Sequence, residues 1–491
     1  MSTPSFETFC EKAKEGNLVP IYREIVADCE TPVSAFLKIR KGKYPFLFES
    51  VEGGEKWGRY SFLGADPSIL IRGEGTEVRV SRREGSETVI TRKEPLHVLR
   101  DLLAEFKPVD VEGLPRFFGG AVGYLSYDMV RFFEPVALRH PAKPAPDFFF
   151  LITDTLLIFD NVKHRIKVVC NAFIEGDDLK TIYDDAVCKI EKLIETLKQP
   201  LVAPRLSEKE GPSAVPVSNV TREQFEKSVL KAKDYITAGD IFQVQISQRF
   251  SVPLTADAFT VYRALRSINP SPYMFYLEID ETCLVGTSPE VLVRLEGQLV
   301  ETRPIAGTRA RGKCEAEDQR LEVELLADPK ECAEHVMLID LGRNDVGRVC
   351  QYGTVETNEV MVIERYSHVM HIVSNVRGDL QEGKDAFDVL AACFPAGTVT
   401  GAPKIRAMEI IDELETERRS LYAGAVGYFS FQGNMDTCIT IRTIVVENGQ
   451  ATVQAAAGIV ADSDPGREYE ETVNKAKAMQ AAIVFAEKGL I

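Results

Sequence analysis

Short apolar runs alternate with polar residues between about residues 45 and 90, and glycines and charged residues separate one run from the next. A period of two with turns between the runs predicts antiparallel strands. In the segment 95–107, PLHVLRDLLAEFK, apolar residues recur at helical spacing instead. A second β-rich block at 148–173 precedes a helix that we expect from about 177 to 198. The chain before residue 199 is therefore expected to combine strands with a few helices.

The best candidate for a boundary is the segment 200–220, which contains four prolines among polar residues. This composition is typical of a linker. The residues that follow, Thr221 and Gln224, fit a capping box that opens a helix. The sequence thus predicts an N-terminal region 1–199, a linker 200–220 and a C-terminal region 221–491.

Beyond the linker, helical and strand patterns mix without a strict βαβ alternation, which favours an α+β fold over a doubly wound parallel sheet. Two stretches in the chain resemble one another: FGGAVGYLSYD at 118–128 and YAGAVGYFSFQ at 422–432. Both continue into aromatic, strand-like sequence and not into a helix. We therefore expect small residues at a close contact between strands, and not a dinucleotide-binding loop.

The composition, 45% hydrophobic and 27% charged residues, is that of a globular protein, and 491 residues suggest two domains or one unusually large one. Asp and Glu outnumber Lys and Arg by 74 to 58, and this net charge of −16 argues against a broad nucleic-acid or anionic-membrane surface. The ten cysteines form no CxxC pair, and the first residues lack the apolar core of a signal peptide. A reduced, cytoplasmic protein is expected.

Two acidic segments predict helices that carry chemistry. In ADPKECAEHVMLIDLGRND, 327–345, Asp328 is a good N-cap, Pro329 suits the first helical position, and Glu331 stands where a capping box places an acid. Helical spacing also predicts that Glu331, Glu334, His335 and Leu338 share one face, which brings two carboxylates together. Capping and a functional role for Glu331 both remain open from this pattern.

The second segment, DPGREYEETVNKAKAM at 464–479, opens in the same way with Asp and Pro. It places Glu468, Glu471 and Lys475 along one face. A surface helix with an i,i+4 ion pair explains this spacing as well as a functional site does. Two carboxylates from separate helices, with space for substrate oxygens and water, would nevertheless suit Mg²⁺.

The stretch RPIAGTRARG, 303–312, suggests a small anion site, with a tight turn at Gly307, a hydroxyl at Thr308 and three arginines. It lacks the lysine and spacing of a phosphate-binding loop, and its centre is Ala306. His371 lies in an apolar run, where a lone histidine is more often a core residue than a catalyst. Arg442 also lies in an apolar run, where a buried guanidinium needs a partner.

Several of these stretches, in this order, resemble the anthranilate synthase component I family of chorismate-utilising enzymes: RPIAGTR, KECAEHVMLIDLGRND, YSHVMHIVS, FPAGTVTGAPKIRAMEIIDELE, YAGAVGYFSF, DTCITIRT and EETVNKAKAM. The resemblance runs from about residue 45 to the C-terminus. It implies a large α+β fold with an antiparallel β-sandwich core and helices packed outside. It also implies binding of chorismate with Mg²⁺.

Position by position, the resemblance implies Glu334 and Glu471 as metal ligands, and Glu331 and His371 as catalytic residues. The two carboxylates of chorismate would be held by Gly307, Thr308, Tyr422, Arg442, Ala457, Gly458 and Lys475. Ammonia would add at C2 of chorismate as the C4 hydroxyl leaves, and aminodeoxyisochorismate would then lose the enolpyruvyl group to give anthranilate and pyruvate. Ala456 departs from the glycine that many relatives carry, so backbone contacts at this turn are less secure.

The resemblance also bears on the nucleophile. Related aminodeoxychorismate synthases carry a nucleophilic lysine where this chain has Ala306, and isochorismate synthases carry a basic lysine where it has Gln243. Both differences favour ammonia as the nucleophile. The chain has no cysteine-centred amidotransferase motif of the GxCxGxx type, so use of glutamine would require a glutamine amidotransferase subunit, component II, as a partner.

FES, 48–50, and NPSPYM, 269–274, resemble the tryptophan feedback site of the family, although relatives often have leucine in place of Phe48. The residues expected there are Ser50, Pro272, Tyr273 and Met274, with Glu49 and Tyr428 nearby. Tryptophan would place its indole near Met274 and Tyr273, and its ammonium and carboxylate at Glu49 and Ser50. A plain turn entering a strand also explains NPSPYM.

Two alternatives are less favoured. An aminodeoxychorismate synthase component I would belong to the same superfamily, but Ala306 argues against it. A catalytically silent sensor of chorismate or tryptophan would need only the binding groups, and this chain retains Glu331, Glu334, His371 and Glu471 together.

Overall fold

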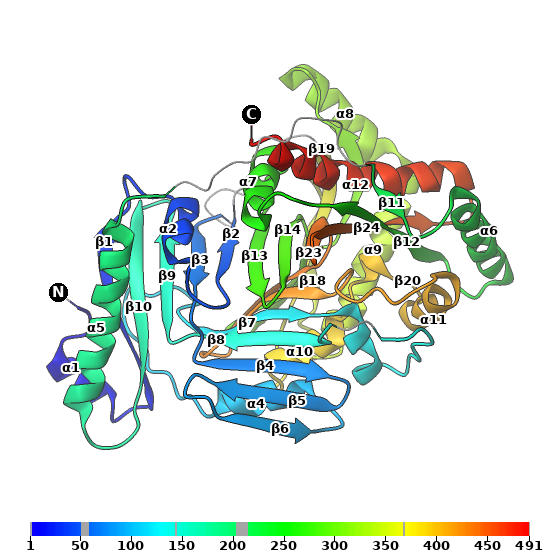
Figure 1. Ribbon diagram of the computed structural model, residues 1–491. Coiled ribbons are helices and arrows are strands. Elements are labelled where there is room, and N and C mark those ends of the chain that lie inside the picture. The colour runs from blue at the N-terminus through cyan, green and yellow to red at the C-terminus, as the bar shows by residue number, and fades with distance from the viewer. Residues whose placement is uncertain (1, 51–57, 143–144, 203–214, 367–368, 491) are drawn as a thin grey trace.

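The computed structural model describes residues 2–50, 58–142, 145–202, 215–366 and 369–490. Two large antiparallel sheets form its centre, and helices cover their outer faces (Figure 1). The α-helices are α1 (Phe6–Lys12), α2 (Pro32–Ile39), α4 (Leu96–Ala104), α5 (Leu179–Lys198), α6 (Arg222–Ala238), α7 (Ala258–Ile268), α8 (Glu315–Ala327), α9 (Pro329–Gly347), α10 (Ala386–Cys393), α11 (Lys404–Leu414) and α12 (Pro465–Glu487). Two short 3₁₀ helices are η1 (Tyr127–Phe132) and η2 (Gly397–Val399).

The first sheet contains strands from both sides of the predicted linker. Its order is β1 (Leu18–Val26), β10 (Arg165–Phe173), β9 (Thr155–Asp160), β3 (Tyr60–Gly64), β2 (Phe46–Glu49), β13 (Tyr273–Ile279), β14 (Thr282–Ser288), β23 (Thr443–Glu447), β24 (Gln450–Ile459), β12 (Gln243–Pro253) and β11 (Val217–Ser218), with β20 (Gly401–Ala402) also on β12. The two parts of the chain meet where β2 pairs with β13, with Met274 opposite Glu49.

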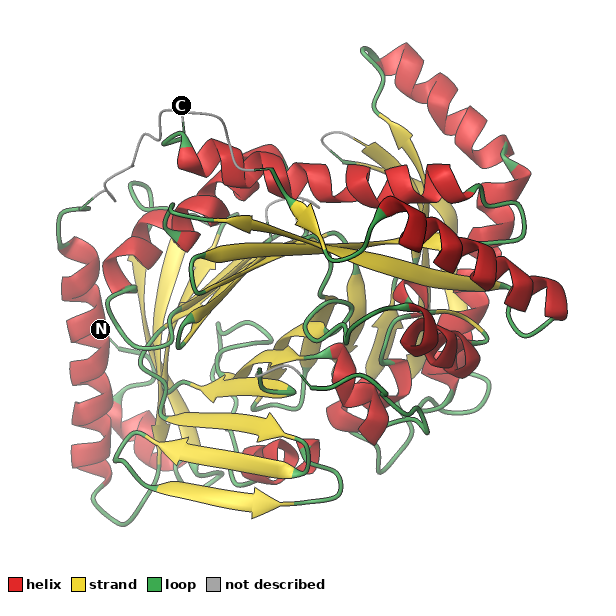
Figure 2. Ribbon diagram, turned by 45° about the vertical axis from the view of Figure 1, so that its right-hand side comes forward, coloured by secondary structure: helices red, strands yellow, loops and turns green. Residues whose placement is uncertain are grey.

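The second sheet is mixed in the same way. Its order is β17 (Ile305–Ala310), β19 (Val369–Asp379), β16 (Leu299–Thr302), β15 (Val291–Glu296), β22 (Met435–Ile439), β21 (Ala425–Ser430), β7 (Gly120–Leu125), β8 (Phe148–Ile152), β4 (Ile69–Glu74), β5 (Glu77–Arg82) and β6 (Glu87–Thr91), with β18 (Glu356–Arg365) also on β19. In Figure 2, as in Figure 1, strands β4, β5 and β6 of this sheet run across the lower part of the view, whereas the strands of the first sheet beside α5 run up it.

The two stretches that resemble one another are β7 and β21, which pair directly with Gly123 opposite Gly427. A β-carbon on Gly123 would lie 1.9 Å from the carbonyl oxygen of Phe149, and one on Gly427 would lie 2.1 Å from that of Asp436. Any side chain would therefore force the strands apart. This confirms that the glycines serve close contact between strands.

Apolar side chains fill the space between the sheets. Phe46, Phe62 and Leu277 from the first sheet contact Val122 and Phe149 from the second in one buried cluster. Outside the first sheet, α5 covers β10 while α7 and α12 cover β14 and β24; on the second sheet, α9 lies against β17 and β19. This arrangement explains why the strands of both sheets carry long apolar runs.

The local predictions for helices agree with the structure. Thr221 and Gln224 form the expected capping box at the start of α6. Residues 203–214 of the predicted linker lie outside the described residues, whereas 217–218 form the short edge strand β11. Since both sheets combine strands from either side of this segment, the division into two regions stays a prediction.

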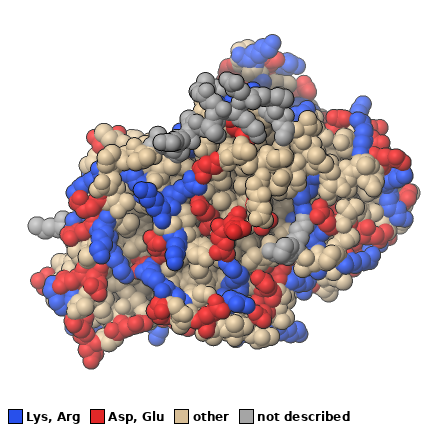
Figure 3. Space-filling view, in the orientation of Figure 1, with Lys and Arg blue, Asp and Glu red and all other residues tan. Residues whose placement is uncertain are grey.

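Among the described residues, no helix is both long and apolar enough to cross a bilayer. Basic and acidic side chains are interspersed over the face shown in Figure 3, and neither sign covers it. This face therefore offers no broad basic surface of the kind that nucleic acids need.

Candidate active site

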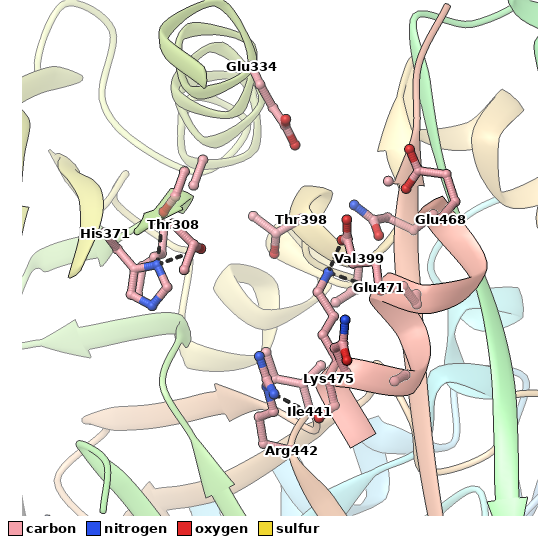
Figure 4. Close-up of a pocket in the computed structure, with 18 of the residues that line it drawn as sticks. Thr308, Glu334, His371, Thr398, Val399, Ile441, Arg442, Glu468, Glu471 and Lys475 are labelled. Carbon is pink, nitrogen blue, oxygen red and sulfur yellow. Dashed lines mark hydrogen bonds and ion pairs between the residues drawn. The ribbon is translucent and has the colours of Figure 1, made fainter. Parts of the chain in front are cut away.

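A cavity of about 1120 Å³ lies among β17, β19, β24, η2, α9 and α12. Figure 4 shows residues of β17 and β19 on one side of this space and residues of α12 on the other, with Glu334 pointing in from α9. Strands of both sheets and two of the long helices thus contribute to one site.

This cavity is lined by most of the residues that the sequence predicted to bind chorismate or the metal ion or to act in catalysis: Gly307, Thr308, Glu331, Glu334, His371, Tyr422, Arg442, Gly458, Glu471 and Lys475. Ala457 is the exception, because its side chain is fully buried in the apolar cluster between β12, α6 and α11. Successive side chains on a strand point to opposite faces, so its neighbours Ala456 and Gly458 line the cavity instead. The methyl group of Ala457 therefore cannot contact a ligand there.

Gly307 lies within strand β17 and not in the tight turn that the sequence suggested. The register of β17 on β19 shifts between Ala306 and Thr308, which marks a β-bulge at Gly307. Its φ of +63° is in the left-handed region, and a β-carbon there would lie 3.2 Å from Oε2 of Glu331. The glycine is thus required by the bulge and by the nearby carboxylate.

The three arginines of RPIAGTRARG do not form an anion site, so this expectation was wrong. Each of them pairs with carboxylates of the chain itself: Arg303 with Glu359 and Glu364, Arg309 with Glu324, Asp328 and Glu331, and Arg311 with Asp318. These ion pairs neutralise the three arginines and connect β17 and its flanking residues to β18, α8 and α9. The cations that remain for a ligand come from other segments.

His371 lies on β19 opposite Thr308, and its ring faces the cavity. Its Nδ1 is 2.9 Å from the carbonyl oxygen of Gly307 and 3.1 Å from Oγ1 of Thr308. A carbonyl oxygen can only accept, so we assign the proton to Nδ1, which leaves a lone pair on Nε2. Burial lowers the pKa of His371, so the ring is neutral at pH 7 and can act as a base.

Helix α9 begins as predicted, with Asp328 as N-cap and Pro329 in the first turn. Glu331 does not close a capping box; its Oε1 instead accepts from Nη1 of Arg309 at 3.1 Å. Its carboxylate lies at the cavity wall. The structure therefore favours the functional interpretation of Glu331 over the capping interpretation.

Glu334 lies one turn further along α9 and accepts a hydrogen bond of 2.7 Å from Nε2 of Gln243. Burial raises the pKa of Glu334, and the nearby carboxylates of Glu331 and Glu471 raise it further. A β-carbon on Gly458 would lie 2.7 Å from Nε2 of Gln243. The glycine thus leaves room for the amide that orients Glu334.

His335 does not share the cavity face of α9, contrary to the expected grouping. It is fully buried, and its Nε2 lies 2.7 Å from Oγ of Ser374 on β19. Burial lowers its pKa to about 4, so the ring is neutral. One residue of rotation along a helix is enough to turn this side chain into the core.

Helix α12 contributes Glu468, Glu471 and Lys475 to the opposite wall. Nζ of Lys475 lies 2.7 Å from Oε1 of Glu471 and donates at 3.0 Å to the carbonyl oxygen of Ala456. Burial raises the pKa of Glu468, and the charge of Glu471 adds to this effect. The predicted i,i+4 pair is present, but it faces a cavity and not a solvated surface.

Arg442 lies where the chain crosses from β22 in the second sheet to β23 in the first, with a φ of +51°. Its Nη1 donates to the carbonyl oxygen of Lys475 at 2.8 Å. Burial lowers its pKa, and in the described part of the chain no carboxylate forms an ion pair with it. A buried guanidinium without a counter-ion is suited to bind an anionic ligand.

Glu290 lines the same cavity and was not among the residues nominated from the sequence. Burial raises the pKa of Glu290 to about 8, so this group is a neutral acid at pH 7. The hydroxyl of Thr398 lies beside Glu290 and interacts with its carboxyl group. The sequence does show Glu290 as a carboxylate within the apolar stretch GTSPEVLV. Arg442 was identified in the same way, as a charged residue within an apolar run.

The carboxylates of Glu334 and Glu471 fit a hard divalent cation. They come from two different helices at one cavity, and their mutual repulsion is a cost that a bound cation would relieve. Across the described ranges, no three His, Cys, Asp or Glu side chains already form a metal cage. A site with two carboxylates and several positions for water or substrate suits Mg²⁺.

A second cavity of about 300 Å³ lies between the sheets at the joint of β2 and β13. The residues expected to bind tryptophan all line it, namely Ser50, Pro272, Tyr273 and Met274, as do Glu49 and Tyr428. The hydroxyl of Tyr273 donates to Asp436 at 2.8 Å, and Arg116 donates to the other oxygen of Asp436 at 2.8 Å. Aromatic and charged groups from both sheets therefore meet around this cavity.

The carboxylate of Glu49 is not free to bind an ammonium group, contrary to what the sequence suggested. It accepts hydrogen bonds from Tyr262 and from Nε of Arg266, the latter at 3.0 Å. Met274 is only 1% exposed and packs on the same side as these residues. The aromatic rings that line the cavity, including Tyr273 and Tyr428, are thus better placed than Met274 to contact an indole.

Comparison with known proteins extends these observations. Residues 46–481 match the family described as chorismate binding enzyme. The proteins named anthranilate synthase component 1 from Synechocystis sp. and Acetivibrio thermocellus are 51% identical over 505 residues and 47% identical over 489 residues, and each comparison covers 98% of this chain and 99% of the relative.

Solved structures give the same picture. Anthranilate synthase component I from Streptococcus pneumoniae matches with a TM-score of 0.77 and 37% identity over 93% of this chain and 98% of that one. The menaquinone-specific isochorismate synthase MenF from Escherichia coli shares the fold, with a TM-score of 0.71 at 19% identity over 98% of this chain and 99% of that one. With two antiparallel sheets inside a shell of helices and sequence similarity over nearly its whole length, the chain belongs to the family of chorismate-binding enzymes.

Proposed function

We propose that this protein is component I of an anthranilate synthase, which converts chorismate and ammonia to anthranilate and pyruvate through aminodeoxyisochorismate, the first committed step of tryptophan biosynthesis. The observation that carries this proposal is the composition of the large cavity. It combines Arg442, which has no ion-pair partner among the described residues, with a carboxylate pair, the neutral base His371 and the neutral acid Glu290. Relatives that are 47% and 51% identical to this chain are named anthranilate synthase component 1.

Chorismate is a dicarboxylate, and the cavity offers two ways to neutralise it. Arg442 and Lys475 supply positive charge on one wall, with the hydroxyl of Tyr422 beside them. Mg²⁺ held by Glu334 and Glu471 would neutralise and orient the ring carboxylate. The backbone of Gly307 and Gly458 and the hydroxyl of Thr308 would complete the contacts.

Amination requires a proton donor for the C4 hydroxyl that leaves. Glu290 holds a proton at neutral pH and has little competition from water, so it is the best-suited donor in this cavity. Glu331, paired with Arg309 at the cavity wall, would assist as a second general acid or base. In the elimination that follows, Nε2 of His371 would take the C2 proton as the enolpyruvyl group departs.

Two residues support ammonia as the nucleophile. Ala306 lines the cavity with a methyl group, which can form no covalent intermediate. Gln243 is 1% exposed and donates its amide to Glu334, so it cannot activate water as a basic residue could. An aminodeoxychorismate synthase is therefore not favoured. A silent sensor is not favoured either, because it would need no acid and base in the binding site.

The direct test uses the fluorescence of anthranilate. The chain alone, mixed with chorismate, Mg²⁺ and an ammonium salt, should form anthranilate, whereas glutamine should replace ammonium only after a glutamine amidotransferase subunit is added. Absence of product with ammonium would contradict the proposed activity. Glutaminase activity of the isolated chain would contradict the proposed partner.

We expect the pH dependence of amination to report the acid Glu290. The rate per concentration of neutral ammonia should fall about tenfold per pH unit above pH about 8, because Glu290 loses its proton there. The measurement is the steady-state rate between pH 6 and 10, with ammonium adjusted at each pH. Glu290→Gln should be slower and should lose this decline. If the rate of Glu290→Gln still declined at alkaline pH as in the wild type, the decline would arise from another group.

We further propose that tryptophan inhibits the protein by binding in the second cavity. A ligand between the sheets at this joint inhibits only if it binds an inactive arrangement more tightly than the active one. Ser50→Phe should fill the cavity and abolish inhibition by tryptophan while leaving turnover without tryptophan nearly intact. Inhibition curves would be compared with those of Ser86→Phe, a change in the exposed turn between β5 and β6. Equal inhibition of wild type and Ser50→Phe would remove Ser50 from the regulatory site.

We place the protein in the cytoplasm. All ten cysteines are free thiols in the structure, and four of them are buried. A reducing compartment preserves such thiols.

A further inference from the structure

Arg419, in the connection between α11 and β21, carries a positive charge that is almost completely buried. Its side chain is 1% exposed and pairs with Glu415, with Nη2 at 2.7 Å and Nε at 3.0 Å from the carboxylate oxygens. Nη1 donates to the carbonyl oxygen of Val399 at 2.6 Å, and Nη2 donates to that of Gln245 at 2.7 Å. The guanidinium thus joins segments that are far apart in the sequence.

The two carbonyl contacts of Arg419 lie directly behind walls of the active-site cavity. Val399 belongs to η2, Gln245 to β12, and the guanidinium also lies 5.6 Å from the centre of the Tyr422 ring. Val399, Gln245 and Tyr422 all line the cavity, whereas Arg419 does not. One buried side chain therefore touches three separate cavity walls from outside.

The charge of Arg419 is locally balanced. Burial alone would lower its pKa, but the adjacent Glu415 carboxylate more than offsets this and raises the pKa of Arg419 above its ordinary value. Glu415 also accepts from the backbone nitrogen of Ser247 at 2.9 Å and from its hydroxyl at 2.7 Å. Because the pair is neutral as a whole, its effect on a ligand must come mainly from the geometry that it fixes.

We propose that Arg419 is a positioning residue for the chorismate reaction, which holds Tyr422, Gln245 and the loop of Val399 in the geometry that turnover requires. The inference rests on the proposed function. Through Val399 the same contact fixes the neighbouring Thr398, which faces the acid Glu290. Displacement of this loop would alter both substrate binding and proton donation.

A planar guanidinium is required for this role. Arginine presents five N–H donors in a fixed fork, so it can bind a carboxylate with two bonds and two further carbonyl oxygens in other directions. Lysine keeps the charge but has a single ammonium with three donors on a flexible chain. Arg419→Lys should therefore keep the ion pair with Glu415 and lose at least one of the two carbonyl contacts.

The test compares Arg419→Lys with Arg418→Lys. Arg418, the preceding residue, is also largely buried, but it donates to His140 and lies 3.7 Å from Asp128, outside the cavity walls. We expect kcat/KM for chorismate to fall on the order of 100-fold in Arg419→Lys, as small misplacements of reacting groups do, and to remain near wild type in Arg418→Lys. Melting temperatures of both variants would show how much stability each loses.

A double variant separates positioning from stability. Arg419→Met with Glu415→Gln removes both charges, so it should regain much of the stability that Arg419→Met alone loses by leaving Glu415 unpaired. Under the proposal, kcat/KM stays low in the double variant, and the alkaline decline assigned to Glu290 shifts. Recovery of kcat/KM together with stability would overturn the proposal, as would equal losses in Arg418→Lys and Arg419→Lys. Failure of the wild type in the same ammonium assay would refute the proposed function instead.

Discussion

Replacing either Glu334 or Glu471 with glutamine should make the protein almost insensitive to Mg²⁺ over the range that activates the wild type. Each change removes one of the two anionic ligands of the proposed site, so Mg²⁺ affinity should fall by more than the roughly 10–100-fold that loss of a supporting contact costs. Activity should decline in parallel at fixed Mg²⁺. Titration calorimetry with Mg²⁺ alone would measure the loss of affinity independently of turnover.

The structure also predicts that Glu334→Gln does not fail by unfolding. The pKa of Glu334 is raised in the folded state, so ionisation of this carboxylate costs stability once the pH exceeds its ordinary value, and a neutral amide removes that cost. Without Mg²⁺ the melting temperature at pH 7 should equal or exceed that of the wild type. Glu322→Gln on α8, where the carboxylate pairs with Arg365, is the matched control and should titrate normally. If Glu334→Gln and Glu471→Gln bound Mg²⁺ as the wild type does, neither residue would be a metal ligand.

In His371→Met, elimination should slow by about 10²–10⁴-fold, the usual contribution of a positioned base, while amination is affected much less. Nε2 of His371 has a free lone pair because Nδ1 donates to Gly307, so the ring can accept the C2 proton in the second step. Aminodeoxyisochorismate should then accumulate. Chromatography of quenched reactions would measure the intermediate, anthranilate and remaining chorismate separately.

His335→Met provides the comparison for His371→Met. His335 is buried and bonds to Ser374, so its loss should lower stability without separating the two chemical steps. If His371→Met slowed both steps equally and no intermediate appeared, His371 would have a structural role. The lowered pKa of His371 adds a second readout, since elimination should persist to lower pH than an ordinary histidine would allow.

Signals confined to a few neighbouring residues predicted the structure well. Thr221 and Gln224 are close in sequence and form their capping box, and Asp328 and Pro329 open α9 as expected. The close contact between strands expected at the two similar stretches is also present, because only glycine fits where a neighbouring backbone lies so near Gly123 and Gly427. In each case the interacting groups, or the constraint on them, are visible in the local sequence. That the two stretches pair with each other was not predicted.

Features that depend on distant partners were not predictable from local sequence. The arginines of RPIAGTRARG suggested an anion site, but their charges are neutralised by carboxylates on β18, α8 and α9, which only the tertiary fold brings near. Glu290 was missed because its raised pKa arises from burial by other segments. The grouping of His335 with Glu334 was wrong because the position of β19, and not helical spacing alone, decides which face is buried.

In both sheets, strands from the first third of the sequence pair with strands that are synthesised much later, and this affects how the chain folds during synthesis. Strands β2 and β7 leave the ribosome long before their partners β13 and β21. About 300 further residues must be synthesised after Gly123 before its partner Gly427 is available. At about 5–20 residues per second, β7 remains an open sheet edge for roughly 15–60 s. Exposed edges invite pairing with other chains. Nascent chains of this protein are therefore expected to depend on chaperones until the last third of the sequence has emerged.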